Sequence, residues 1–158
     1  MKYVEYLMYV LLAVSAIVFV YTFFGHEPVL KEKHTVVDVI PAMQKHIGRN
    51  EKLIMIALTP NCSYCLQSLP FYKTLLEQRK DEITVVAAID TSMVIELQKR
   101  LLERQRVFVD TLIGIPTQEW GIHAVPTIIS LNEFAEVKNV WIGLLDEIRE
   151  EEVLSIVR

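Results

Sequence analysis

Two cysteines at the junction between an apolar run and a helical pattern constrain the fold of this chain more than any other feature. Cys62 and Cys65 are separated by two residues and are the only cysteines among 158 residues. The run Lys52–Leu58 before them (KLIMIAL) is apolar with polar flanks, as in a strand covered on both faces. In Gln67–Arg79, after them, leucine and tyrosine recur at helical spacing. The pattern predicts a strand, a short loop, and a helix with the cysteines at its N-terminal end.

This placement gives the two cysteines different chemistry. A cysteine at a helix N-terminus meets unpaired backbone N–H groups and the positive end of the helix dipole, and both stabilise a thiolate. We therefore expect Cys62 to have a lowered pKa and to act as the attacking nucleophile. The two-residue spacing places Cys65 one helical turn away, where its sulfur can attack a mixed disulfide and release the partner. Cys62 and Cys65 are the predicted catalytic pair of a thiol–disulfide oxidoreductase.

Two other interpretations of the cysteines are weaker. Unreactive core cysteines are common, but they seldom have this spacing at a strand-to-helix junction. A metal site needs further ligands, and the four histidines are scattered along the sequence. We predict no metal site and no cofactor.

Strands and helices alternate along the rest of the chain, which predicts an α/β fold with a central sheet. Further predicted strands are Ile83–Ile89, Val107–Val109, Thr127–Leu131 and Val137–Ile142. Predicted helices are Ser92–Arg106, with Val94, Leu97, Leu101 and Leu102 facing inward, and Asp146–Val157, with a brief helical turn at Ile115–Gly121. The short polar turn before Val137 makes the last two strands antiparallel.

Thr35–Ile47 supports two interpretations. The segment VVDVI is either a short strand followed by a helix that begins at Pro41, or part of a helix with a capping box at Thr35 and Asp38 that ends at Gly48. We prefer the second, although it places Pro41 inside the helix.

The region from Lys52 to the C-terminus resembles the thioredoxin superfamily, and within it the membrane-anchored TlpA/ResA-like branch. Pro70 lies five residues after Cys65, where thioredoxin-like proteins kink the active-site helix. The segment GIHAVPT, ending at Thr127, resembles the loop that holds a cis-proline beside the cysteines. The long stretch between Cys65 and Pro126 is similar to the insertion of the TlpA branch. The resemblance implies a three-layer sandwich with a central mixed sheet, and a substrate-binding loop formed by Val125, Pro126 and Thr127.

A second Ile-Pro-Thr, at 115–117, competes for the cis-proline role. Polar residues rather than a strand follow it, so Pro126 is the better candidate. Only proline makes the cis peptide bond accessible, at about 0.5–1 kcal/mol.

The chain departs from the superfamily at two positions. Asn61 stands where the family usually has a tryptophan, and Ile56 stands where thioredoxins carry a buried acid that helps to deprotonate the second cysteine. Water or Glu51 is left for that task. His123, near the cis-proline loop, is expected to be a solvated loop residue. Thr59 resembles the T-x-x-C motif of peroxiredoxins, but Met55 replaces the proline of that motif, which makes peroxide reduction a minor alternative.

The twenty residues Tyr6–Gly25 contain no charged side chain. A helix of that length spans about 30 Å, the thickness of the hydrocarbon core of a bilayer. A cleaved signal peptide, the rival interpretation, normally has a shorter apolar region and a small-residue cleavage site, whereas this run ends in bulky residues. We predict a transmembrane anchor in residues 1–25, a linker in 26–34, and a thioredoxin-like domain in 35–158.

Lys and Arg residues near the ends of the apolar run favour neither orientation in the membrane. A domain of about 130 residues behind a first hydrophobic segment is commonly exported, so we expect a single-pass membrane protein with its redox domain on the periplasmic, extracytoplasmic side. The formal net charge is −4 and no basic stripe is present, which argues against nucleic acid as a partner.

The resemblance implies a reductant of protein disulfides that draws electrons from a membrane partner, with cytochrome c maturation as a pathway. Its predicted partners are protein thiols and disulfides, an extracytoplasmic electron-transfer protein, and the membrane itself. A disulfide-forming oxidase is the competing enzyme, and a membrane-tethered binding or chaperone module without turnover is the alternative from another class.

Overall fold

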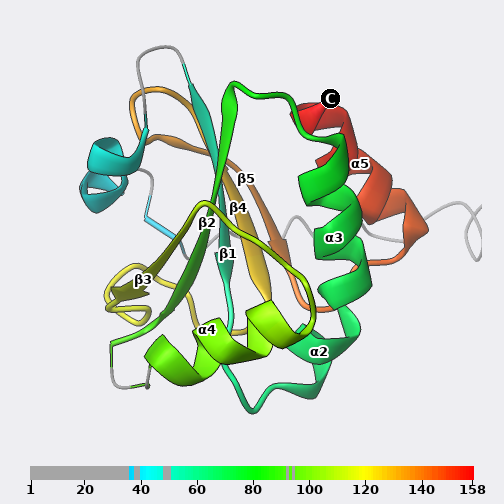
Figure 1. The fold of residues 1–158 in the computed structure, drawn as a ribbon. Helices are drawn as coiled ribbons and strands as arrows, with labels where there is room; N and C mark the ends of the chain where they lie inside the picture. Colours follow the sequence, from blue (N-terminus) through cyan, green and yellow to red (C-terminus); the bar gives the residue numbers. More distant parts are fainter. Residues whose placement is uncertain (1–35, 38–39, 48–50, 92, 94) are drawn as a thin grey trace, which may run out of the picture. The chain divides into compact units, whose positions relative to one another are not determined.

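One mixed sheet forms the centre of the computed structural model, which describes residues 36–37, 40–47, 51–91, 93 and 95–158. Among these residues five strands pair in the order β3-β2-β1-β4-β5 (Figure 1). They are β1 (Lys52–Ala57), β2 (Ile83–Asp90), β3 (Thr111–Ile115), β4 (Thr127–Leu131) and β5 (Val137–Ile142). β1, β2 and β3 run parallel to one another, whereas β4 is antiparallel to both β1 and β5. The predicted central mixed sheet is confirmed.

The apolar run of β1 forms a central strand because both of its faces are covered. Ile54 and Ile56 belong to the core on one face, and Leu53 and Met55 belong to the core on the other. None of the four is more than 1% exposed. Successive side chains of a strand point to opposite faces, so a strand buried on both sides has a continuous apolar sequence.

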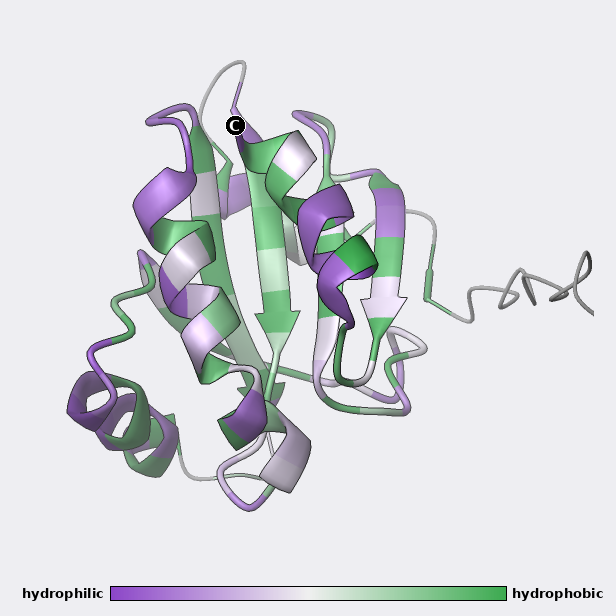
Figure 2. Cartoon of the chain, turned by 90° about the vertical axis from the view of Figure 1, so that its right-hand side faces the viewer, coloured by the Kyte–Doolittle hydropathy of each residue, from purple (hydrophilic) through white to green (hydrophobic). Residues whose placement is uncertain are grey.

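Helices complete the layers on the two faces of the sheet. They are α2 (Ser63–Gln67), α3 (Leu69–Gln78), α4 (Ile95–Arg104), α5 (Glu147–Val157) and the short 3₁₀ helix η1 (Pro41–His46). α3 and α5 pack side by side on one face (Figure 1). Viewed from that side, the central strands behind them are mostly hydrophobic, the edge strand β5 includes a hydrophilic stretch, and the two helices show hydrophilic residues on their outer sides (Figure 2). On the opposite face, η1 contributes Met43 to the core.

The preferred interpretation of the segment before β1, a helix from Thr35, is wrong. Val36, Val37 and Ile40 are not helical, and η1 begins at Pro41. The backbone N–H of Val37 instead donates to the carbonyl oxygen of Trp120 at 3.2 Å. Proline suits the first position of a helix because its missing N–H would have no partner there.

The strand predicted at Val107–Val109 is also misplaced, because β3 starts at Thr111. Val107 instead helps to close the C-terminal end of α4. Its backbone N–H donates to the Leu102 carbonyl oxygen at 2.9 Å, and the preceding residue, Arg106, has a φ of 58°. Gly114 obscures β3 in the sequence, since glycine is depleted in strands. A Cβ there would meet the Ile95 side chain at 3.3 Å.

The predicted inward face of α4 is partly wrong. Leu102 is buried at 3% exposure, as expected, but Leu97 is 51% exposed and Gln98 is buried.

The predicted anchor Tyr6–Gly25 and the linker after it lie outside the described residues. Within the part that the structure describes, no helix combines the length and the apolar character needed to cross a bilayer.

Candidate active site

Cys62 occupies the N-terminal end of α2, a few residues beyond the end of β1. It is the N-cap residue, and its Sγ accepts the backbone N–H of Cys65 at 3.0 Å. The cap is normally supplied by a side-chain oxygen, and here a sulfur atom takes that role. The side chain is half-buried and not joined in a disulfide. Cys62 therefore presents an accessible sulfur to the free N–H groups of a helix end, as the spacing predicts.

Cys65 lies one turn further along α2 and is buried at 4% exposure. Burial, together with a hydrogen bond to Cys62 and the charge of that residue, raises the pKa of the Cys65 thiol from 9.0 to about 12. A backbone hydrogen bond with Thr59 opposes this rise only in part. The two thiols thus differ strongly in their access to solvent, and Cys65 holds its proton in the reduced chain.

The loop before β4 lies against the cysteines. The Val125–Pro126 peptide bond is cis, as expected, and the Cys62 Sγ contacts the Val125 carbonyl oxygen at 3.6 Å. Two further bonds hold the loop: the Thr127 hydroxyl donates to Ala124 O at 2.7 Å, and the Gly143 N–H donates to Pro126 O at 2.8 Å. The structure brings all five predicted site residues together; a role for the loop in binding substrate stays a prediction.

Ser68 marks a break in the helix that carries the cysteines. It follows α2 and precedes α3, with Pro70 in the first turn of α3. The Ser68 hydroxyl donates to the Tyr64 carbonyl oxygen at 2.9 Å, and the Tyr72 N–H donates to the Ser68 carbonyl oxygen at 3.1 Å. The expected interruption beside Pro70 is present, and the chain continues in a helical direction through it.

Solved structures with a similar fold are numerous. StoA from Bacillus subtilis is 19% identical over 69% of this chain and 84% of its own, with a TM-score of 0.58. A thiol-disulfide isomerase from Corynebacterium glutamicum is 12% identical over 68% of this chain and 80% of its own, with a TM-score of 0.57. A putative thioredoxin from Neisseria meningitidis is 15% identical over 68% and 75%, with a TM-score of 0.56.

This chain has a thioredoxin-like fold. No protein-family model matches its sequence, and its sequence has no significant match to a curated protein. The likeness to solved structures therefore establishes the fold, and the site must supply the argument for function.

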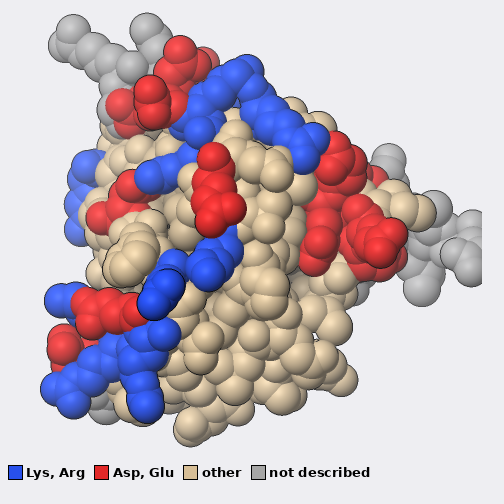
Figure 3. Space-filling model, turned by 45° about the vertical axis from the view of Figure 1, so that its right-hand side comes forward, with Lys and Arg blue, Asp and Glu red and all other residues tan. Residues whose placement is uncertain are grey.

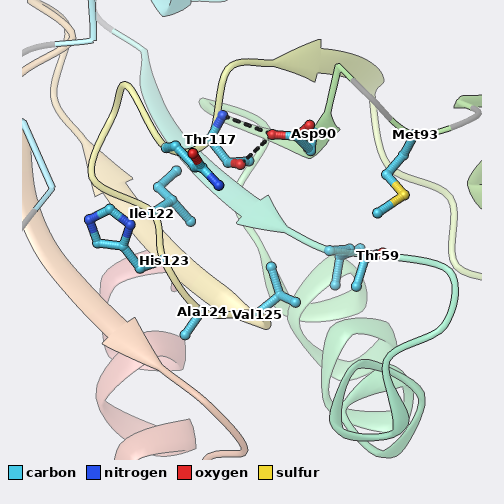
Figure 4. Close-up of a pocket in the computed structure, with 10 residues that line it drawn as sticks. Thr59, Asp90, Met93, Thr117, Ile122, His123, Ala124 and Val125 are labelled. Carbon is cyan, nitrogen blue, oxygen red and sulfur yellow. Dashed lines mark hydrogen bonds between the residues drawn. The ribbon is translucent and has the colours of Figure 1, made fainter.

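A cavity of about 240 Å³ lies between the loop before β4 and the segment that follows β1 (Figure 4). Thr59 and Val125 line the cavity, and each also contacts Cys62 through its carbonyl oxygen: Thr59 O accepts the Cys62 N–H at 3.3 Å, and Val125 O lies beside the sulfur. Two residues of the cavity lining therefore border Cys62.

The far wall of this cavity was not identified from the sequence. Asp90 accepts hydrogen bonds from the backbone N–H of Thr117, at 3.3 Å, and from its hydroxyl group. Met93 lies across the cavity from Ile122 (Figure 4). Asp90 ends β2 and Thr117 follows β3, so both lie at the carboxyl ends of the parallel strands, where the cysteines follow β1. Ligand sites of α/β sheets favour that edge, which is the signal that sequence reasoning did not use.

The segment that carries the cysteines has no charged side chain. No Lys, Arg, Asp or Glu occurs from Leu53 to Tyr72. Tyr64 and Leu66 of α2 are exposed large apolar side chains in this stretch. Figure 3 shows charged side chains gathered over α4 and over the upper part of the molecule, and an uncharged surface over α2 and the loop before it.

The structure shows the surroundings of Ile56 and of the residues considered as substitutes for the missing acid. Ile56 is buried in the same core as Cys65, so no acid of β1 reaches that thiol. Glu51, proposed as a substitute, precedes β1 at the end opposite the cysteines, where it accepts the Thr84 hydroxyl at 3.2 Å. His123 is exposed in the loop before Pro126, as expected. Among the described residues no cluster of three His, Cys, Asp or Glu side chains is suited to a metal ion.

Proposed function

We propose that this chain is a membrane-tethered thiol–disulfide oxidoreductase that reduces disulfides of protein substrates through a mixed disulfide on Cys62. The observation that carries the proposal is the asymmetry of the cysteine pair. An accessible sulfur caps α2 and accepts the Cys65 N–H at 3.0 Å, while the second thiol lies buried directly behind it. Neighbours in structure named thioredoxin and thiol-disulfide isomerase support the same chemistry.

In the first step the Cys62 thiolate attacks one sulfur of a substrate disulfide. A bond forms between the Cys62 Sγ and that sulfur, and the substrate's own S–S bond breaks. The leaving substrate sulfur departs as a thiolate and takes a proton from solvent. The capping N–H of Cys65 stabilises the attacking anion before this step.

In the second step Cys65 loses its proton and attacks the Cys62 Sγ of the mixed disulfide. The new bond joins the two cysteines, and the remaining substrate sulfur leaves as a thiolate. The substrate gains two electrons and the Cys62–Cys65 pair loses two. A separate thiol donor must then return the pair to its reduced state.

The direction of electron transfer, the membrane tether and the cellular location of the redox domain are proposed from the sequence. The resemblance to the TlpA/ResA-like branch favours a reductant supplied with electrons by a membrane partner, acting in cytochrome c maturation. The apolar run Tyr6–Gly25 favours a single-pass anchor with the redox domain on the periplasmic side.

The surface near Cys62 supports polypeptide rather than ionic substrates. Tyr64 and Leu66 expose apolar area on α2, and no charged residue occurs in the sequence from Leu53 to Tyr72. The cavity beside the loop before β4 has room for one side chain of a bound segment. Exposed apolar patches of this kind mark interaction sites.

Two measurements on the full chain test the proposal. Insulin reduction with a thiol donor should occur with the wild-type chain and be absent in Cys62→Ser, because that variant lacks the attacking sulfur. A chain that binds insulin but never reduces it would favour the binding-module alternative. The reduction potential of the Cys62–Cys65 pair separates the two enzymes: about −270 mV or below fits a reductant, and about −120 mV fits an oxidase.

A further inference from the structure

Resolution by Cys65 demands that a buried thiol become an anion. The pKa of that thiol is raised to about 12, chiefly by burial. The strand position that holds an acid in thioredoxins is the apolar Ile56. Within the described residues, the titratable group that acts on Cys65 is Cys62 itself. Backbone hydrogen bonds at Thr59 and at Cys65 itself favour the thiolate, but they leave the pKa of Cys65 raised. A further hydrogen-bond donor would therefore promote ionisation of this buried thiol.

Tyr72 places an uncommitted hydroxyl group on the same side of the helix. Cys65, Ser68 and Tyr72 are spaced at i, i+3 and i+7 from α2 into α3, and Ser68 between the two helices keeps right-handed helical backbone angles. Tyr72 is 1% exposed and belongs to the same core as Cys65. Its hydroxyl has no hydrogen-bond partner among the described residues. The nearby Ser68 hydroxyl donates its own proton to Tyr64 O.

An unpartnered buried hydroxyl is rare and calls for an explanation. The Ser68 side chain is near enough to act on the Tyr72 hydroxyl, but it donates its own proton to Tyr64 O, and among the described residues the Tyr72 hydroxyl completes no hydrogen bond. The neighbouring helix α5 buries only the apolar Val153, Leu154 and Val157, and its Glu152 accepts the indole N–H of Trp141 at 3.1 Å. The ionisable groups that act on the Tyr72 hydroxyl are the two thiols.

The Tyr72 hydroxyl also keeps its proton over the range in which the thiols work. Burial raises the pKa of Tyr72 above its ordinary value; an interaction with the Ser68 side chain opposes this rise in part, and the charges of Cys65 and Cys62 add to it. A phenol that stays neutral remains a hydrogen-bond donor whenever Cys65 ionises.

We propose that the Tyr72 hydroxyl donates a hydrogen bond to the Cys65 thiolate and thereby promotes the second step of the exchange. This inference rests on the thiol–disulfide exchange proposed above. Cys65 gives its proton to solvent, the Tyr72 O–H turns its free donor toward the new anion, and the Cys65 sulfur then displaces the substrate thiolate from Cys62. Tyr72 is neither oxidised nor deprotonated, so the electron balance of the exchange is unchanged.

Rapid mixing of the reduced full chain, in mild detergent, with excess dithiobisnitrobenzoate separates the two steps. Attack by Cys62 releases one coloured thiolate at a rate that rises with reagent concentration, and resolution by Cys65 releases a second at a rate that does not. In Tyr72→Phe we expect an unchanged first phase and a second phase about three- to tenfold slower at neutral pH. The pH at which the second phase becomes fast should be higher in Tyr72→Phe than in the wild-type chain.

Thr74→Val is the matched control, because it removes a hydroxyl from the same helix at a site where it donates to Pro70 O. Both phases should match those of the wild-type chain. Urea unfolding should show Tyr72→Phe to be at least as stable as the wild-type chain, since it deletes an unpaired buried polar group.

A second phase in Tyr72→Phe with the wild-type rate overturns the inference, as does a slower second phase with an unmoved pH dependence. Absence of the first phase in the wild-type chain overturns the proposed exchange itself. The experiment therefore distinguishes an error in the role of Tyr72 from an error in the proposed thiol–disulfide exchange.

Discussion

Slow alkylation of Cys65 is the prediction that follows most directly from the burial of the pair. Cys62→Ser leaves Cys65 as the only cysteine of the chain. Iodoacetamide reacts with the thiolate, so its rate reports both the ionised fraction and the nucleophilicity of the sulfur. Comparing the native variant with the same variant in guanidinium compares a buried thiol with an ordinary one.

The magnitude follows from the pKa of Cys65. A rise from 9.0 to about 12 lowers the thiolate population at neutral pH about a thousandfold. The more basic thiolate is also the better nucleophile, which restores a factor of about 15 to 30. Ionisation alone therefore slows alkylation by about thirty- to sixtyfold. Burial, the largest cause, survives the loss of the Cys62 sulfur, so we expect at least about a tenfold slowing in the variant.

Cys65→Ser provides the comparison, because its remaining cysteine is the accessible Cys62. Labelling of Cys62 in the native chain should be far faster than labelling of Cys65, with both followed by mass spectrometry of the intact protein. If native and unfolded Cys62→Ser were labelled at rates within about twofold of each other, the buried, protonated state of Cys65 would be refuted.

Three further predictions concern stability in urea. Burial raises the pKa of Asp110, but hydrogen bonds from Arg79 and the Val85 N–H outweigh it and hold the pKa below its ordinary value. Asp110→Asn should therefore lower the free energy of unfolding by about 1–2 kcal/mol at neutral pH, and by progressively less as pH falls through the native pKa of Asp110. An equal loss of stability in acid would contradict this. Gly143 has a φ of 83° with open space around it, so Gly143→Ala should cost about 1 kcal/mol through backbone strain alone, and an unchanged stability would contradict that cause. The raised pKa of Cys65 stabilises the reduced chain below pH 9 and should cease to do so as pH rises towards 12, so wild type should lose more stability than Cys65→Ala over that range.

The sequence predicted the parts of this site that depend on short-range pattern. The apolar run of β1, the cysteine spacing and the proline before β4 are local features that can be recognised in a few consecutive residues. Cys62, Cys65 and Pro126 follow from such features, and the structure brings them together. The anchor over Tyr6–Gly25 stays a prediction.

Features that depend on residues far away in the sequence could not be predicted from local pattern. β3 contains Gly114, which fits because the Ile95 side chain approaches the strand closely, and no local pattern reveals that neighbour. Leu97 has the spacing of a core residue but lies on the exposed side of α4, because tertiary packing rather than periodicity sets the orientation of that helix. Tyr72 has the sequence pattern of an ordinary core residue, since its unpaired hydroxyl is visible only once its surroundings are known.

Covalent trapping of a substrate tests the central assignment of the two cysteines most directly. Cys62→Ser and Cys65→Ser chains would each be mixed with a disulfide-bonded protein, quenched with acid, and separated on a non-reducing gel. Cys65→Ser keeps the attacking sulfur and loses the resolving one, so it should accumulate a mixed disulfide that disappears on reduction, while Cys62→Ser should form none. A complex trapped by Cys62→Ser but not by Cys65→Ser would contradict the account.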